Sequence, residues 1–168
     1  MIEYKPITPS DIPQLWTFLT QLDSQTDCMM YEPEERNTRT TPSHLQADIQ
    51  NNVINGEDCI YLALDSGKII GYIHAERGKY NRIHHIAYIV TGVLKSHRAR
   101  GIGTALFKYI DQWARENSII RLELTVECHN EAAKHLYEKT GFTVEGIRKN
   151  SMCVNGRYID EYYMAKLL

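Results

Sequence analysis

The chain has 168 residues, 43% hydrophobic and 24% charged, and a formal net charge of −2 at pH 7. This length suits one domain over residues 1–168, with a core large enough to need no disulfide or structural metal. The charge balance argues against a general nucleic-acid binder, and no apolar run approaches the length of a membrane span.

The first third of the chain predicts a strand and two helices. Residues 2–8 alternate apolar and polar, as a half-buried strand does. Thr8-Pro9-Ser10-Asp11 predicts a helix start with Thr8 as the N-cap, and apolar residues at helical spacing follow it. Residues 23–41 are polar and irregular, which predicts a loop with room for a short helix. A second helix is expected to begin at Thr41-Pro42 and to end at Gly56.

The middle of the chain predicts three consecutive strands. Residues 59–64 and 68–78 are apolar runs on either side of Asp65-Ser66-Gly67, a turn sequence suited to an antiparallel hairpin. A third run, residues 83–93, leads directly into a basic segment that contains two glycines. We therefore expect the residue that follows this third strand to begin a functional loop.

The remaining elements complete a mixed fold. A helix is predicted at 104–117, a strand at 121–126 and a helix at 130–139. A terminal hairpin is expected around Asn155-Gly156, a strong turn pair, with strands at 143–153 and 158–167. This order predicts an α/β (α+β) fold: a mixed, mostly antiparallel sheet flanked by helices on both faces.

The basic segment at residues 93–106 predicts an anion site built from main chain. Gly101 and Gly103 lack Cβ atoms and can expose consecutive N–H groups, and a helix beginning near Thr104 adds unpaired donors and its positive dipole end. Four basic side chains crowd the segment, which suits a ligand with several phosphates: Lys95, His97, Arg98 and Arg100. The alternative is an ordinary turn with solvated charges.

Two motifs give this segment a family resemblance. It has neither the Gly-Lys-Ser/Thr ending of a nucleoside-triphosphate P-loop nor the third glycine of a dinucleotide fingerprint. It reads Arg98-x-x-Gly101-x-Gly103, and residues 130–142 read Asn-x-x-Ala-x-x-Leu-Tyr-x-x-x-Gly-Phe. In this order the motifs resemble the acetyl-CoA loop and downstream signature of the GNAT superfamily of N-acetyltransferases. The likeness extends more weakly over nearly the whole chain.

The resemblance implies acetyl-CoA as the co-substrate and assigns the residues that hold it. A backbone N–H near Val93 would meet the acetyl carbonyl oxygen, and Lys95 N–H and Asn130 would contact the pantetheine arm. Lys134 could approach the adenosine phosphate, although an exposed helical lysine is usually only a solvated charge. The pyrophosphate would lie on the N–H groups of Arg98, Ala99, Arg100, Gly101, Ile102, Gly103 and Thr104. The resemblance also implies that the strands before and after the loop helix diverge.

Tyr137 matches the general acid usual in the family. Acyl transfer to an amine needs a proton for the departing thiolate. Tyr137 lies two helical turns after Asn130 and so on the same helix face. A phenol with a pKa near 10 stays protonated at neutral pH. The alternative is a tyrosine that only packs by its ring.

The motifs leave the general base and the acceptor site open. Some relatives carry a glutamate on the strand after the loop helix, at the position of Thr125 here. His85 is a candidate base on the third run, with a structural histidine as the alternative. Glu32, Glu34 and Glu35 could attract a cationic amine and relay its proton, with a solvated acidic loop as the alternative.

The sequence therefore predicts an acetyl-CoA-dependent N-acetyltransferase that acts on a primary amine of a small molecule by direct transfer in a ternary complex. The C-terminal segment from Glu145 resembles the branch that holds amino-acid, polyamine and ribosomal-protein acetyltransferases. A protein N-terminus is thus the alternative acceptor. A non-catalytic acyl-CoA sensor is the alternative outside enzymes.

Partners and location follow from what the sequence lacks. No metal is expected, because the cysteines have no CxxC spacing and the histidines no persuasive ligand set. Without a disulfide framework or a signal-peptide h-region, we expect a cytoplasmic protein. No nucleic-acid or membrane partner is expected, and a homodimer stays open. The cysteines are Cys28, Cys59, Cys128 and Cys153.

Overall fold

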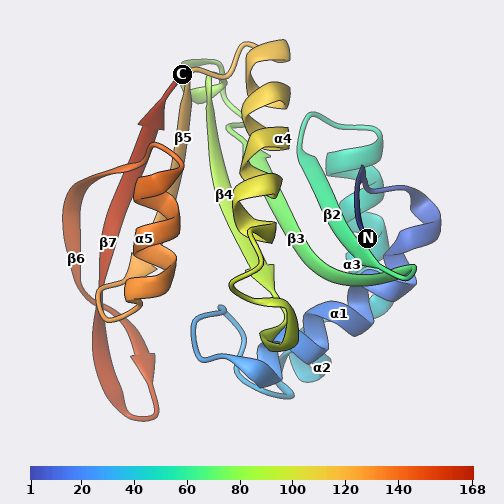
Figure 1. Cartoon of the computed structure of the whole chain (residues 1–168), viewed down its shortest axis with the longest axis horizontal. Coiled ribbons are helices and arrows are strands. Elements are labelled where there is room, and N and C mark those ends of the chain that lie inside the picture. The colour runs from blue at the N-terminus through green and yellow to red at the C-terminus, as the bar shows by residue number, and fades with distance from the viewer.

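The computed structural model describes residues 1–168 and is organised around one seven-stranded sheet of order β1-β2-β3-β4-β5-β7-β6 (Figure 1). All neighbouring strands are antiparallel except β4 and β5. The mixed, mostly antiparallel sheet expected from the element order is confirmed. The strands are β1 (Ile2–Pro6), β2 (Cys59–Asp65), β3 (Lys68–Arg77), β4 (Ile86–Val93), β5 (Arg121–Glu127), β6 (Thr143–Val154) and β7 (Arg157–Leu167).

Helices cover both faces of this sheet. A Cβ built on Gly71 of β3 would lie 3.3 Å from Ile102 of α4, whereas the next residue, Tyr72, stacks edge-on against Phe18 of α1. Successive strand residues point to opposite faces, so α4 and α1 lie on opposite sides. The helices are α1 (Ile12–Gln25), α2 (Glu35–Arg39), α3 (Pro42–Ile49), α4 (Ile102–Glu116) and α5 (Glu131–Lys139). None of them combines the length and the hydropathy that a membrane crossing requires.

Local signals explain where several elements begin and end. The Thr41 hydroxyl accepts the His44 N–H at 3.2 Å, which confirms the predicted helix start there. At Thr8 the chain first forms a 3-10 turn, Pro9–Asp11, in which Asp11 accepts the Thr8 N–H at 2.8 Å, and α1 begins at Ile12. Asn155, with φ of 50°, and Gly156, with φ of 75°, form the predicted turn between β6 and β7. Helix α3 is shorter than expected, because its last turns, at Gln50–Ile54, are π-helical.

The parallel strands β4 and β5 separate after a short contact. They pair only at Ile86↔Arg121, Ala87↔Leu122 and Tyr88↔Glu123, after which β4 stays with β3 and β5 with β7 (Figure 1). The divergence implied by the family resemblance is confirmed. It opens toward the end of β4 from which the basic segment leaves.

The third strand starts later than the apolar run suggested. Asn81–Ile83 form a 3-10 turn, and both His84 and His85 precede β4. The His84 carbonyl accepts Arg77 Nε at 2.8 Å, and the His85 carbonyl accepts Ile120 N–H at 3.0 Å. The prediction that His85 lies on a strand is wrong, because these carbonyls are committed to the turn and to the entrance of β5.

Candidate active site

The start of α4 presents free main-chain donors. Helix α4 begins at Ile102, two residues earlier than predicted, with Gly101 as its N-cap at φ of 75°. Its first backbone hydrogen bond runs from Ala105 N–H to the Gly101 carbonyl at 3.0 Å. The N–H groups of Ile102, Gly103 and Thr104 therefore have no acceptor within the helix. A Cβ on Gly101 would meet no heavy atom within 4 Å, so a bulky phosphate group has room to approach.

The basic side chains around these donors are largely unpaired. Lys95, Arg98 and Arg100 are exposed, and none of them forms a salt bridge. Arg98 Nε donates to the Val93 carbonyl at 3.1 Å, which folds the segment back on the end of β4. Ala99 has a positive φ of 59° and is exposed. The free charges and free N–H groups together fit a ligand with several phosphate groups, such as acetyl-CoA.

Lys95 differs from what the resemblance implies. Its N–H, the expected pantetheine contact, donates instead to Gln25 Oε1 at 2.8 Å. Gln25 is the last residue of α1, so this contact ties the basic segment to the N-terminal helix. A pantetheine arm on Lys95 would need Gln25 to give way.

Gly103 serves packing as well as ligand approach. A Cβ there would lie 2.7 Å from Leu136 Cδ2, so the absence of a side chain lets α4 and α5 pack closely. Gly103 and Leu136 belong to the two sequence motifs. The same contact thus brings the motifs side by side in space.

Tyr137 lies on α5 inside an aromatic cluster. Its ring centroid is 5.8 Å from that of Phe107 and 6.1 Å from that of Phe142, and only 9% of the residue is exposed. Burial raises the pKa of the Tyr137 phenol, and the nearby Glu127 and Tyr88 raise it further. A phenol held protonated in this way suits a proton donor.

Glu127 and Tyr88 lie on the face of the sheet that carries α1, because they are in register with the strand residues that face that helix. After burial, these two residues are the main causes of the raised pKa of Tyr137. Helix α5, which carries Tyr137, packs beside α4 through the contact between Gly103 and Leu136.

Asn130 and Lys134 have partners within the chain. Asn130 Oδ1 accepts Ala133 N–H at 3.2 Å and so caps α5, and its Nδ2 donates to Cys28 Sγ at 3.3 Å. Lys134 Nζ pairs with Glu138 at 2.7 Å, and this contact raises the pKa of Lys134. A ligand contact with Lys134 would compete with that pair.

The face of the sheet that carries α1 has polar groups that the sequence did not single out. The Tyr88 hydroxyl and Thr125 Oγ1 are 2.9 Å apart. Glu127 and Glu161 are cross-strand partners, 4% and 6% exposed, and burial is the largest cause of a raised pKa at Glu127. The sequence position of Glu127 could have identified it, because Glu127 follows Thr125 by two residues on the same strand and so points to the same face of the sheet.

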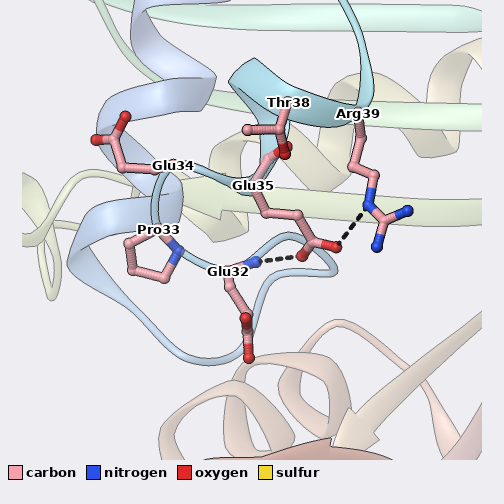
Figure 2. Close-up of a pocket in the computed structure, with 6 residues that line it drawn as sticks. All are labelled: Glu32, Pro33, Glu34, Glu35, Thr38 and Arg39. Atoms are coloured by element: carbon pink, nitrogen blue, oxygen red, sulfur yellow. Dashed lines mark hydrogen bonds and ion pairs between the residues drawn. The ribbon is translucent and has the colours of Figure 1, made fainter.

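The acidic segment forms an open hollow of about 570 Å³ (Figure 2). Glu35 accepts Glu32 N–H at 3.0 Å and pairs with Arg39 at 3.4 Å, and Glu34 accepts the Asn37 side-chain amide at 3.0 Å. Glu32 alone keeps a carboxylate without a partner in the chain. The hollow is lined by Glu32, Pro33, Glu34, Glu35, Thr38 and Arg39.

A buried ion pair anchors this segment to α1. Arg36 Nε donates to Asp23 Oδ2 at 2.6 Å and Arg36 Nη2 donates to Asp23 Oδ1 at 3.1 Å, and the Asp23 side chain is 1% exposed. The guanidinium also lies 4.5 Å from the ring centroid of Tyr31. The glutamates thus face solvent because Arg36 holds the other side of α2 inward.

His85 is not brought to this site. It is exposed at the beginning of β4, whereas the basic segment leaves the end of that strand. Eight strand residues span about 26 Å, so His85 is far from the end of β4 that Arg98 contacts. The geometry does not favour His85 as the general base, and the structure gives it no contact with Tyr137.

Comparison with known proteins identifies the family. The profile of the acetyltransferase (GNAT) family matches residues 20–142. The chain belongs to the GNAT family. L-amino acid N-acetyltransferase AaaT of Escherichia coli (strain K12) is 33% identical over 110 residues, which cover 63% of this chain. The chain spans 66% of that relative's length, just under two thirds.

Solved structures with this GNAT fold match the chain over nearly its whole length. The structure of a GNAT-family acetyltransferase from Streptococcus pneumoniae is 27% identical, with a TM-score of 0.92 over 100% of this chain and 99% of that one. The structure of yncA from Salmonella typhimurium with its cofactor acetyl-CoA is 15% identical, with a TM-score of 0.86 over 99% of this chain and 94% of that one. The second likeness shows the fold alone.

Proposed function

We propose that this GNAT protein moves the acetyl group of acetyl-CoA to a primary amine of a small molecule, by direct transfer in a ternary complex. The observation that carries the proposal is the close approach of the two motifs. Gly103, at the start of α4 with its free N–H groups, packs against Leu136, the residue before the buried Tyr137 on α5. A phosphate group held at the start of α4 would therefore lie near the helix that carries the proposed proton donor.

The residues of the chain have distinct roles in this proposal. Acetyl-CoA supplies an activated acetyl group as a thioester. The N–H groups of residues 102–104 bind its pyrophosphate, and Lys95, Arg98 and Arg100 attract the phosphate charge. A main-chain N–H near Val93 stabilises negative charge that develops on the acetyl oxygen.

Proton transfer then balances the reaction. The amine nitrogen bonds to the acetyl carbon, the carbon–sulfur bond breaks, and the sulfur takes the proton of the Tyr137 hydroxyl. The proton that the nitrogen releases returns to the Tyr137 oxygen through water. Because the nitrogen must be neutral to attack, turnover should rise with pH until the bound amine is deprotonated.

The acceptor is proposed to be cationic before it binds. Glu32, Glu34 and Glu35 form an acidic rim, of which Glu32 has the free carboxylate. Opposite charges raise the local concentration of a cation and guide its approach. The likeness to an L-amino acid N-acetyltransferase supports a small amine as acceptor.

Release of free CoA thiol is the direct test. We would incubate the protein with acetyl-CoA and amino acids, polyamines, aminoglycosides or short peptides, and compare wild type with Tyr137→Phe. At least one small amine should raise thiol release well above the hydrolysis control. Reaction with peptides alone would favour a protein N-terminus as the acceptor. No turnover, together with no thermal shift at millimolar acetyl-CoA, would refute the proposal.

A further inference from the structure

Three side chains with metal-ligating atoms converge beside the N-cap of α5. Asp27 and Cys28 follow α1, and His129 lies in the turn between β5 and α5. One ligand atom from each of the three lies within 4.8 Å of the others. Carboxylate, thiol and imidazole from two distant segments are thus gathered in one place. We call these three residues the Asp-Cys-His cluster.

The spacing inside the cluster matches that of a tetrahedral cation. Asp27 Oδ1 and Cys28 Sγ are 3.5 Å apart. Zinc bonds of about 2.0 Å to oxygen and about 2.3 Å to sulfur, at the tetrahedral angle, place those atoms about 3.5 Å apart. A cation can therefore bind this pair without changing their separation. His129 is exposed, so its ring can turn toward the same point.

The surrounding contacts hold the two segments together before any cation binds. Asn130 Nδ2 donates to Cys28 Sγ at 3.3 Å across the interface between the segments. Asn130 N–H also donates to the Glu127 carbonyl at 2.9 Å, which closes the turn that carries His129. The cluster thus sits on a defined backbone frame.

We propose that Asp27, Cys28 and His129 bind a divalent cation of the zinc class, with the fourth position left to water. Sulfur and imidazole ligands select zinc or cobalt over magnesium or calcium. The cation is a ligand of the protein rather than a cofactor of acyl transfer. Cys28 contacts Asn130, the N-cap of the helix that carries Tyr137, so the bound cation obstructs the reaction centre and inhibits turnover, a consequence that rests on the proposed function.

Cobalt(II) spectroscopy tests the site without any need for activity. Titrating cobalt into the purified full chain should produce the near-ultraviolet thiolate-to-cobalt charge-transfer band and the visible bands of tetrahedral cobalt, and zinc should abolish both. Cys28→Ser should lose the charge-transfer band, and His129→Ala should bind zinc at least about tenfold more weakly. Cys153→Ser and His135→Ala, which change exposed residues outside the cluster, should behave as wild type.

The outcomes separate the site from its consequence. Absence of the charge-transfer band in wild type, or its persistence in Cys28→Ser with native circular dichroism, overturns the metal site. If cobalt binds as expected, zinc should inhibit thiol release by wild type and by His135→Ala, and inhibit His129→Ala only at higher concentration. Equal inhibition of wild type and His129→Ala would overturn the inhibitory role. Failure of the proposed function would remove turnover but leave the cobalt spectrum unchanged.

Discussion

Replacing Arg36 by methionine should destabilise the protein strongly, although the sequence predicts a polar loop for the segment that contains Arg36. The change leaves Asp23, 1% exposed, without the two hydrogen bonds at 2.6 and 3.1 Å that now satisfy its carboxylate. Breaking one side of a buried ion pair costs about 3–5 kcal/mol. For a chain of this length that corresponds to a fall in Tm of about 6–20 °C.

The matched control is Arg39→Met, three residues further along the same helix. The Arg39 side chain is 70% exposed and pairs with Glu35 at 3.4 Å, so its loss should cost less than about 1 kcal/mol. The double variant Asp23→Leu/Arg36→Met should recover most of the loss, because it removes both charges together. Urea unfolding at pH 7 measures all four free energies.

Equal effects of Arg36→Met and Arg39→Met would refute this reasoning, since they would mean that the buried pair contributes no more than an exposed one. A double variant as unstable as Arg36→Met alone would refute it differently. The loss would then come from the packing of the arginine stem rather than from an uncompensated charge. The four measurements therefore separate charge from packing.

Three further outcomes are expected. Tyr137→Phe should lower kcat by about 10²-fold or more with little change in acetyl-CoA affinity, measured where chemistry limits the rate, because the ring packing survives and the proton does not. Gly101→Ala should lower the free energy of unfolding by about 1–2 kcal/mol, because residue 101 has a φ of 75°. Gly103→Ala should lower it by about 1–3 kcal/mol, because the new Cβ would lie 2.7 Å from Leu136. Thermal shifts measured with and without acetyl-CoA separate the effect on folding from the effect on binding. Burial raises the pKa of Cys59 to about 12, so at pH 8 its thiolate fraction is only about 10⁻⁴. Iodoacetamide should therefore label Cys59 only after the protein unfolds, as measured by peptide mass spectrometry. Rapid labelling of Cys59 in the native protein would contradict its burial.

Features set by neighbouring residues were predictable from the sequence. Thr41 acts as the expected N-cap and Asn155-Gly156 forms the expected turn, because these residues act on backbone groups within three positions of themselves. The two glycine-containing motifs likewise predicted the helix that carries Tyr137, and they predicted the start of α4 to within two residues. The succession of elements along the chain was predicted, whereas the order of strands in the sheet, with β7 between β5 and β6, was not.

Features set by long-range contacts were not predictable. His85 belongs to a continuous apolar run, and only the pairing of its carbonyl with Ile120 shows that β4 has not yet begun. Asp23 and Arg36 look like two charges in a polar loop until α2 folds back on α1. Cys28 and His129 are brought together only by the completed fold, which a reading of cysteine spacing cannot anticipate.

The aromatic cluster around Tyr137 belongs both to the hydrophobic core and to the proposed active site. Phe107 and Phe142, 1% and 2% exposed, are among the largest fully buried side chains, and the proposed proton donor takes its position from their rings. A substitution that trims either ring would shift the hydroxyl as well as open a cavity. Substitutions at these two positions are therefore constrained both by the stability of the fold and by the rate of acetyl transfer. A programme that repacks this core for heat resistance should expect to alter turnover at the same time.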